Sequence, residues 1–155
     1  MISYAWLKVA HILSATVLFG TGLGIAFFKW HTDRSRNVEA VAVIAERVVI
    51  ADWCFTTPAV LLQAVTGVML ARRAGLPLTS GWVLHAIVLY LFAGACWIPV
   101  VWLQIRMREL ARSAARGGRP LDPLYRRYAR VWFWLGVPAF TAVIAIFALM
   151  VLKPA

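Results

Sequence analysis

The charged residues of this chain form clusters separated by long apolar windows. Asp, Glu, Lys and Arg are absent from windows of 20, 19, 32 and 22 residues, at 9–28, 53–71, 74–105 and 131–152. An α-helix needs about 20 apolar residues to cross the hydrocarbon core of a bilayer. The pattern therefore predicts an all-α protein. It is expected to be one domain, residues 1–155, folded as a four-helix transmembrane bundle with spans near 5–28, 53–71, 82–104 and 131–152.

Composition narrows the class of protein further. Of the 155 residues, 63% are apolar and 14% are charged, whereas soluble domains average about 45–50% and about 25%. These values exclude a disordered chain and an ordinary soluble globule, so the lipid bilayer is the first expected partner. The net charge of +10 then has a topological explanation, and we expect no nucleic acid as partner.

The basic residues fall mostly on one side of the predicted bundle. The two termini and the second loop carry four of them: Lys8, Arg72, Arg73 and Lys153. The first and third loops with their flanks carry twelve: Lys29, Arg34, Arg36, Arg47, Arg106, Arg108, Arg112, Arg116, Arg119, Arg126, Arg127 and Arg130. Because Lys and Arg concentrate in loops that stay cytoplasmic, both termini are predicted on the outer, periplasmic side of a bacterial inner membrane.

Several local signals predict where helices begin and where they touch. Asn37 is a predicted N-cap for the amphipathic segment 38–51, which either lies at the membrane interface or extends the second helix beyond it. Asp122-Pro123 is typical of an N-cap followed by proline in the first turn. Gly20 and Gly24 form a small-xxx-small pair, which predicts a close helix contact.

The second span carries a stripe of polar residues along one face. Asp52, Thr56, Gln63 and Thr66 follow one another at steps of four, seven and three. Polar groups in a membrane helix usually face the bundle interior, where this stripe either lines a cavity, supplies a proton donor or hydrogen-bonds a neighbouring helix. Pro58 is expected to kink the helix and open space beside the stripe.

Two histidines are candidate ligands for a haem iron. His11 and His85 lie about 9 Å and about 5 Å into helices that start on the same side, by the α-helical rise. Facing histidines on two helices supply the axial ligands of a b-type haem, and Arg72 and Arg73 lie on the same side to pair with its propionates. The alternative is that both histidines only pack in the bundle. His31 fits an aromatic belt at the opposite boundary.

The sulfur residues offer a second metal hypothesis. Cys54 and Cys96 are expected at different depths, so we predict no disulfide between them. Met69 lies near the predicted depth of the two candidate histidines, which gives a weak copper constellation that ranks below haem.

Four blocks of sequence then occur together in one order. They are Leu7-Lys8-Val9-Ala10-His11-Ile12-Leu13, Phe28-Lys29-Trp30-His31, residues 58–67, and Met150-Val151-Leu152-Lys153-Pro154. In this order they resemble the bacterial membrane family called domain of unknown function 2269. The same skeleton is similar to HemJ-type protoporphyrinogen oxidases and, more distantly, to CopD-like copper proteins. The HemJ resemblance implies that His11 belongs to a Lys-x-x-His motif linked with haem, whereas His85-Ala86 replaces a lysine of that group.

These observations lead to one main functional prediction. We expect a multi-pass inner-membrane protein that binds haem b through His11 and His85 and has an electron-transfer or haem-pathway redox role. A membrane oxidoreductase of HemJ-like type is the enzymatic form of this prediction, with a membrane redox partner or a second copy of the chain as partners. The alternatives are a non-catalytic accessory or assembly subunit of a larger complex, and a copper or solute permease.

Overall fold

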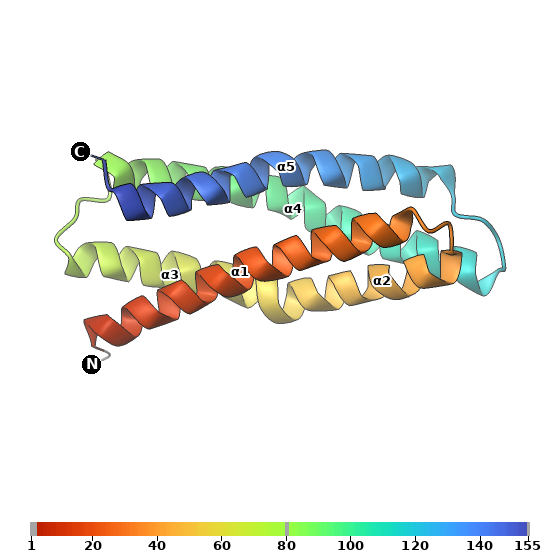
Figure 1. Cartoon of the computed structure of the whole chain (residues 1–155), viewed down its shortest axis with the longest axis horizontal. Coiled ribbons are helices and arrows are strands. Elements are labelled where there is room, and N and C mark those ends of the chain that lie inside the picture. Colours follow the sequence, from red (N-terminus) through yellow and green to blue (C-terminus); the bar gives the residue numbers. More distant parts are fainter. Residues whose placement is uncertain (1–2, 80, 155) are drawn as a thin grey trace.

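Long helices account for nearly all of the chain. The computed structural model describes residues 3–79 and 81–154, and across them every regular element is helical. The elements are α1 (Tyr4–Asp33), α2 (Val38–Ala51), the π-helix η1 (Asp52–Thr56), α3 (Thr57–Arg73), α4 (Gly81–Arg116) and α5 (Pro123–Leu152). Figure 1 shows them as an elongated bundle, which confirms the predicted all-α class.

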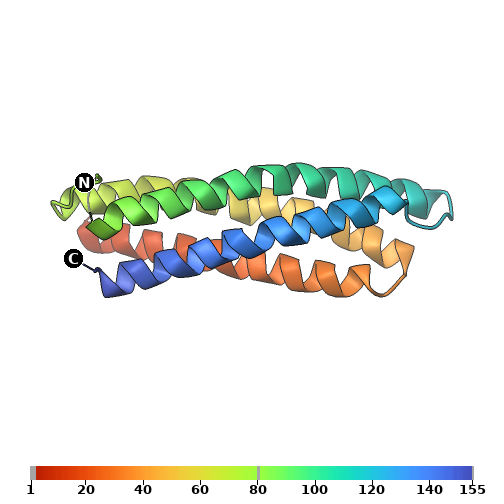
Figure 2. The same ribbon diagram turned by 90° about the horizontal axis from the view of Figure 1, so that it is seen from above.

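The connections divide between the two ends of this bundle. Both described ends of the chain and the α3–α4 connection lie at one end, which we call the terminal end (Figure 1). The α1–α2 and α4–α5 connections lie at the other, which we call the loop end, and Figure 2 shows the same separation from above. The arrangement places the arginine-rich first and third loops side by side, as a four-span topology requires.

The membrane-spanning segments are longer than the sequence windows that predicted them. Four helices are long and apolar enough to cross a bilayer among the described residues: Tyr4–Asp33, Val38–Arg73, Gly81–Arg116 and Pro123–Leu152. A helix of 36 residues measures about 54 Å, against about 30 Å of hydrocarbon. The charge-free windows mark the lipid-embedded part, and the helices continue beyond it at the loop end.

The predicted caps form. The Asn37 side chain accepts a hydrogen bond of 3.0 Å from Ala40 N, so α2 begins at Val38. Asp122 Oδ1 accepts one of 2.7 Å from Leu124 N, and α5 begins at Pro123. The segment 38–51 extends the second span, because α2 continues through η1 into α3 and packs against α4.

The second span changes its hydrogen bonding just before Pro58. Thr57 N bonds to Asp52 O, five residues back, in the π-helical pattern. Pro58 has no N–H to donate, and its ring would clash with the carbonyl of Cys54 in a regular α-helix. The wider π turn accommodates both constraints, and the interruption falls where the proline predicted one.

Helix packing differs from the expectation at the glycines of α1. A Cβ at Gly22 would lie 3.0 Å from Phe140 Cζ on α5, whereas one at Gly20 or Gly24 would meet nothing within 4 Å. The close contact that Gly20 and Gly24 would permit is therefore not made within the described part of the chain. Phe140 meets Gly22 instead, which lies on nearly the opposite side of α1, because each residue turns the helix by about 100°.

Candidate functional site

His11 is buried at the terminal end, in the packing between α1 and α3. Its ring nitrogens both face α3: Nδ1 lies 2.8 Å from Thr66 Oγ1, and Nε2 lies 3.1 Å from Gln63 Nε2. Ser14, one turn further along α1, donates to Gln63 Oε1 over 2.5 Å. We call His11, Ser14, Gln63 and Thr66 the His11 cluster. All four are buried.

The partners of His11 fix its tautomer. An amide nitrogen can only donate, so Gln63 Nε2 donates to His11 Nε2, which must carry a lone pair. The ring proton is then on Nδ1 and is donated to Thr66 Oγ1. Thr66 is free to accept it because its own hydroxyl donates to Leu62 O over 2.5 Å. The cluster therefore holds a neutral imidazole in one defined orientation.

Gly67 explains how the imidazole can lie so close to α3. A Cβ at Gly67 would be 3.2 Å from His11 Cε1, closer than an ordinary van der Waals contact. The bare backbone at this position leaves room for the ring between the two helices. Gly67 therefore allows α1 and α3 to pack closely at this point.

The other predicted haem ligand has different surroundings. His85 is exposed on α4, and its Nδ1 lies 2.9 Å from Gly81 O of its own helix. Arg72 and Arg73 form the last turn of α3, at the terminal end. His31 is exposed near the end of α1 and stacks on Phe27. The described contacts join His11 to α3 and give no link from it to His85.

These contacts allow a test of whether the residues fit a haem iron. The tautomer of His11 fits, because a metal ligand needs a lone pair on one nitrogen and a hydrogen bond from the other. His85 is exposed and bonds to a carbonyl of its own helix, so the described contacts do not bring it to His11. The pairing of His11 with His85 stays a prediction, whereas the surroundings of His11 suit one imidazole ligand.

The predicted polar stripe is buried but serves two different sites. Gln63 and Thr66 face His11, as described above. Asp52 and Thr56, on the other side of Pro58, lie instead beside Gln104 of α4. The π-helix therefore carries one half of the stripe, and α3 carries the other.

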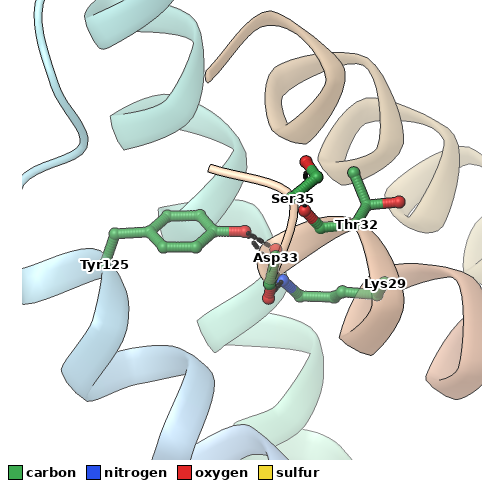
Figure 3. A network of polar contacts seen from close by, with 5 residues as sticks. All are labelled: Lys29, Thr32, Asp33, Ser35 and Tyr125. Atoms are coloured by element: carbon green, nitrogen blue, oxygen red, sulfur yellow. Dashed lines mark hydrogen bonds and ion pairs between the residues drawn. The ribbon is translucent and has the colours of Figure 1, made fainter. Parts of the chain in front are cut away.

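A third buried polar group ties α1 to α5 at the loop end, and Figure 3 shows it. Lys29 Nζ lies 2.7 Å from Asp33 Oδ2 and donates to Tyr125 Oη over 2.8 Å. Tyr125 in turn donates to Asp33 Oδ1 over 2.6 Å. The ammonium also lies 5.5 Å from the ring centre of Trp132, within cation–π range.

Sequence reasoning missed this group because it counted Lys29 only as a charge that sets the topology. A signal did exist in the i, i+4 spacing of Lys29 and Asp33, which favours an ion pair on one helix face. Nothing in the sequence indicated that the pair would be closed by a tyrosine 92 residues away.

Cys54 and Cys96 are both free thiols in the described part of the chain, the first exposed and the second half-buried. Met69 is half-buried on α3. The copper hypothesis gains no further ligand from these positions.

The four spans and the buried polar groups define a multi-pass α-helical integral membrane protein. Comparison with family models gives the same class independently: residues 5–154 match the model described as a predicted integral membrane protein, domain of unknown function 2269. The chain belongs to this family. No curated protein and no solved structure matched the chain.

Proposed function

We propose that this protein is a haem-binding protein of the bacterial inner membrane, with a role in electron transfer or in a redox step of haem metabolism. His11 is the residue that would hold the iron, and Arg72 and Arg73 lie at the same end of the bundle to meet the propionates. The resemblance to HemJ-type proteins, in which the matching histidine is linked with haem, supports this assignment. A redox partner in the same membrane follows from the proposed role.

The observation that carries the proposal is the lone pair on His11 Nε2. Thr66 accepts the Nδ1 proton and orients the ring, as second-shell partners of ligand histidines do. Only the amide of Gln63 occupies the ligating nitrogen. Gln63 is a flexible side chain, so a rotamer change exposes the lone pair without unfolding α1 from α3. In this proposal Gln63 covers the site when no haem is bound.

A haem titration of the purified protein in detergent micelles tests the proposal. We expect a saturable Soret band in the wild type and its loss in His11→Ala. Gln63→Ala should bind more tightly than the wild type, because the competing hydrogen bond is gone. His85→Ala and His31→Ala serve as matched controls and should leave the spectrum unchanged. Equal binding by His11→Ala and the wild type would overturn the assignment of His11.

One observation favours the alternative of an accessory subunit without cofactor. Every polar side chain of the His11 cluster already has a partner within the protein, as in a cluster whose only task is to hold two helices together. Absence of a Soret band in both the wild type and Gln63→Ala would support this alternative. Co-purification with the rest of a larger membrane complex would then be the next experiment.

A further inference from the structure

A second polar site lies away from the His11 cluster, between α1, η1, α4 and α5. It is a partly open pocket of about 260 Å³. Its wall contains one carboxylate, Asp52, together with Thr56, Gln104, Trp97 and Trp132. The remaining lining is apolar and includes Gly22, Gly136 and Phe140. Such a largely apolar wall with a few polar groups is typical of small-molecule sites.

Five polar atoms of this wall make no hydrogen bond of good geometry within the described part of the chain: Asp52 Oδ2, Thr56 Oγ1, Gln104 Oε1, Trp97 Nε1 and Trp132 Nε1. Asp52 lies close enough to Thr56 and Gln104 to interact with both, whereas the two indole N–H groups have no such neighbour among the contacts described. Asp52 is 5% exposed and Gln104 is 4% exposed. Buried polar groups in proteins are nearly always paired, and each unpaired one costs about 1–3 kcal/mol. Five such groups around one pocket therefore call for hydrogen-bond partners that the protein itself does not supply.

The occupant must both donate and accept hydrogen bonds. Asp52, Thr56 and Gln104 offer oxygen acceptors, whereas the two indoles offer only N–H donors. A bare cation would leave both tryptophans unpaired, and a hydrocarbon would offer nothing to any of the five groups. A hydroxyl group serves both kinds, because its one proton goes to one of the oxygens and its oxygen can accept from both indoles.

The size and position of the pocket indicate how large and how apolar the remainder of the ligand is. An apolar cavity of about 150 Å³ holds benzene, so 260 Å³ has room for one ring with substituents. The lining elements all belong to membrane-spanning helices, so a ligand soluble in lipid has access to this depth. The wall outside the polar groups is aromatic and aliphatic, which suits a flat apolar body.

We infer that this pocket binds a small lipophilic hydroxyl compound of the phenol class, whose hydroxyl donates to one of the oxygens of Asp52, Thr56 and Gln104 and accepts from the indoles. The site is distinct from the His11 cluster, because Asp52 and Thr56 lie in the π-helix, whereas Gln63 and Thr66 lie further along in α3. The inference therefore goes beyond the proposed haem function and does not depend on it.

The probe for this site is 4-fluorophenol, observed by ¹⁹F NMR with the full-length protein in lipid nanodiscs. Fluorobenzene has the same ring without the hydroxyl, and empty nanodiscs report simple partition into lipid. We expect a saturable bound signal for 4-fluorophenol with the protein, and binding of fluorobenzene about tenfold weaker, as the loss of one well-made hydrogen bond implies.

Three variants locate the binding. Thr56→Val and Gln104→Leu remove polar groups of the wall and should each weaken 4-fluorophenol binding about tenfold. Gly136→Leu should abolish it, because a Cβ at Gly136 meets nothing within 4 Å and the larger side chain fills the cavity. Thr141→Val is the matched control, since Thr141 is exposed on α5 and bonds only within its helix; it should bind as the wild type does.

Two results would overturn the inference. One is equal affinity for fluorobenzene and 4-fluorophenol, because the polar groups would then recognise nothing. The other is a wild-type signal indistinguishable from empty nanodiscs or from Gly136→Leu, which would assign the cavity to ordered water. Circular dichroism establishes whether each variant is folded. Thr56→Val and Gln104→Leu test the site independently, so one of them still tests it if the other fails to fold.

Discussion

The ammonium of Lys29 on α1 lies 2.8 Å from the phenolic oxygen of Tyr125 on α5, and the lysine side chain is only 1% exposed. A lysine buried in a membrane protein needs a compensating partner, and here Asp33 supplies the opposite charge within the same turn. Tyr125, from α5, bonds to both Lys29 and Asp33, so the three side chains form a hydrogen-bonded triangle. This contact fastens the loop end of the bundle, where the core residues Met107 and Ala111 are also fully buried.

Tyr125→Phe should destabilise the protein by about 1–3 kcal/mol, because the buried ammonium and Asp33 each lose a hydrogen bond. Thermal unfolding in detergent, followed by circular dichroism, measures the effect. Tyr128→Phe on the same helix is the control and should change stability much less, since Tyr128 is only partly buried. Equal effects of the two changes would contradict a specific role for the triangle.

¹⁵N NMR of histidine-labelled protein should show His11 neutral, with the proton on Nδ1 and the lone pair on Nε2. The reason is the direction of the hydrogen bonds from Gln63 and to Thr66. Thr66→Val should weaken this tautomer preference and lower stability by about 1–3 kcal/mol, because the Nδ1 proton loses its acceptor. A spectrum with the proton on Nε2 in the wild type would disprove the proposed chain of donors.

Gly67→Ala and Gly94→Ala should have opposite effects on stability. Each change improves helix propensity by roughly 0.5–1 kcal/mol. At Gly94 the new methyl group meets nothing within 4 Å, so the gain is kept. At Gly67 it would lie 3.2 Å from His11 Cε1 and push the ring away from α3. The difference in unfolding temperature between the two variants measures the cost of this contact. Equal unfolding temperatures would show that the His11 ring moves aside without cost.

Reporter fusions test the orientation of the bundle in the membrane. A periplasm-active reporter placed after the last residue should be active, and a cytoplasm-active reporter in the Gly117-Gly118 turn should be active as well. The reason is the excess of twelve basic residues over four at the loop end. The opposite pattern would place His11 in the cytoplasmic half of the membrane.

The number and order of the helices could be predicted from the sequence because charge is so costly in lipid. The caps at Asn37 and Asp122 could be predicted too, since they depend on residues within three positions of one another. Helix ends beyond the bilayer could not, because the charge-free windows carry no information about where a solvated helix stops. The contact at Gly22 depends on how α5 crosses α1, which no local pattern specifies.

The candidate site was predictable only in part, because contacts between helices are not specified by local sequence patterns. The burial of His11 and of the polar stripe follows from polarity in an apolar helix. The partners do not follow, because they depend on the rotation of α3 about its axis. Likewise, Trp97 and Trp132 resemble many other aromatic residues of the chain, and only the packing of α4 against α5 brings them to one cavity with Asp52.

The π-helix makes the number of residues between Asp52 and Gln63 a structural quantity in itself. Removing one residue from Asp52–Thr56 would restore α-helical hydrogen bonding, because the π turn spaces its bonds five residues apart instead of four. The wide turn takes up the extra residue, so α3 would keep its rotation and Gln63 and Thr66 would still face His11. A deletion in the regular part of α3 before Gln63 would instead turn both side chains away by about 100°. A family member with a one-residue gap should therefore keep the partners of His11 only where the gap falls at the π-helix, so that the place of a gap in an alignment becomes a readout of whether the histidine cluster is kept.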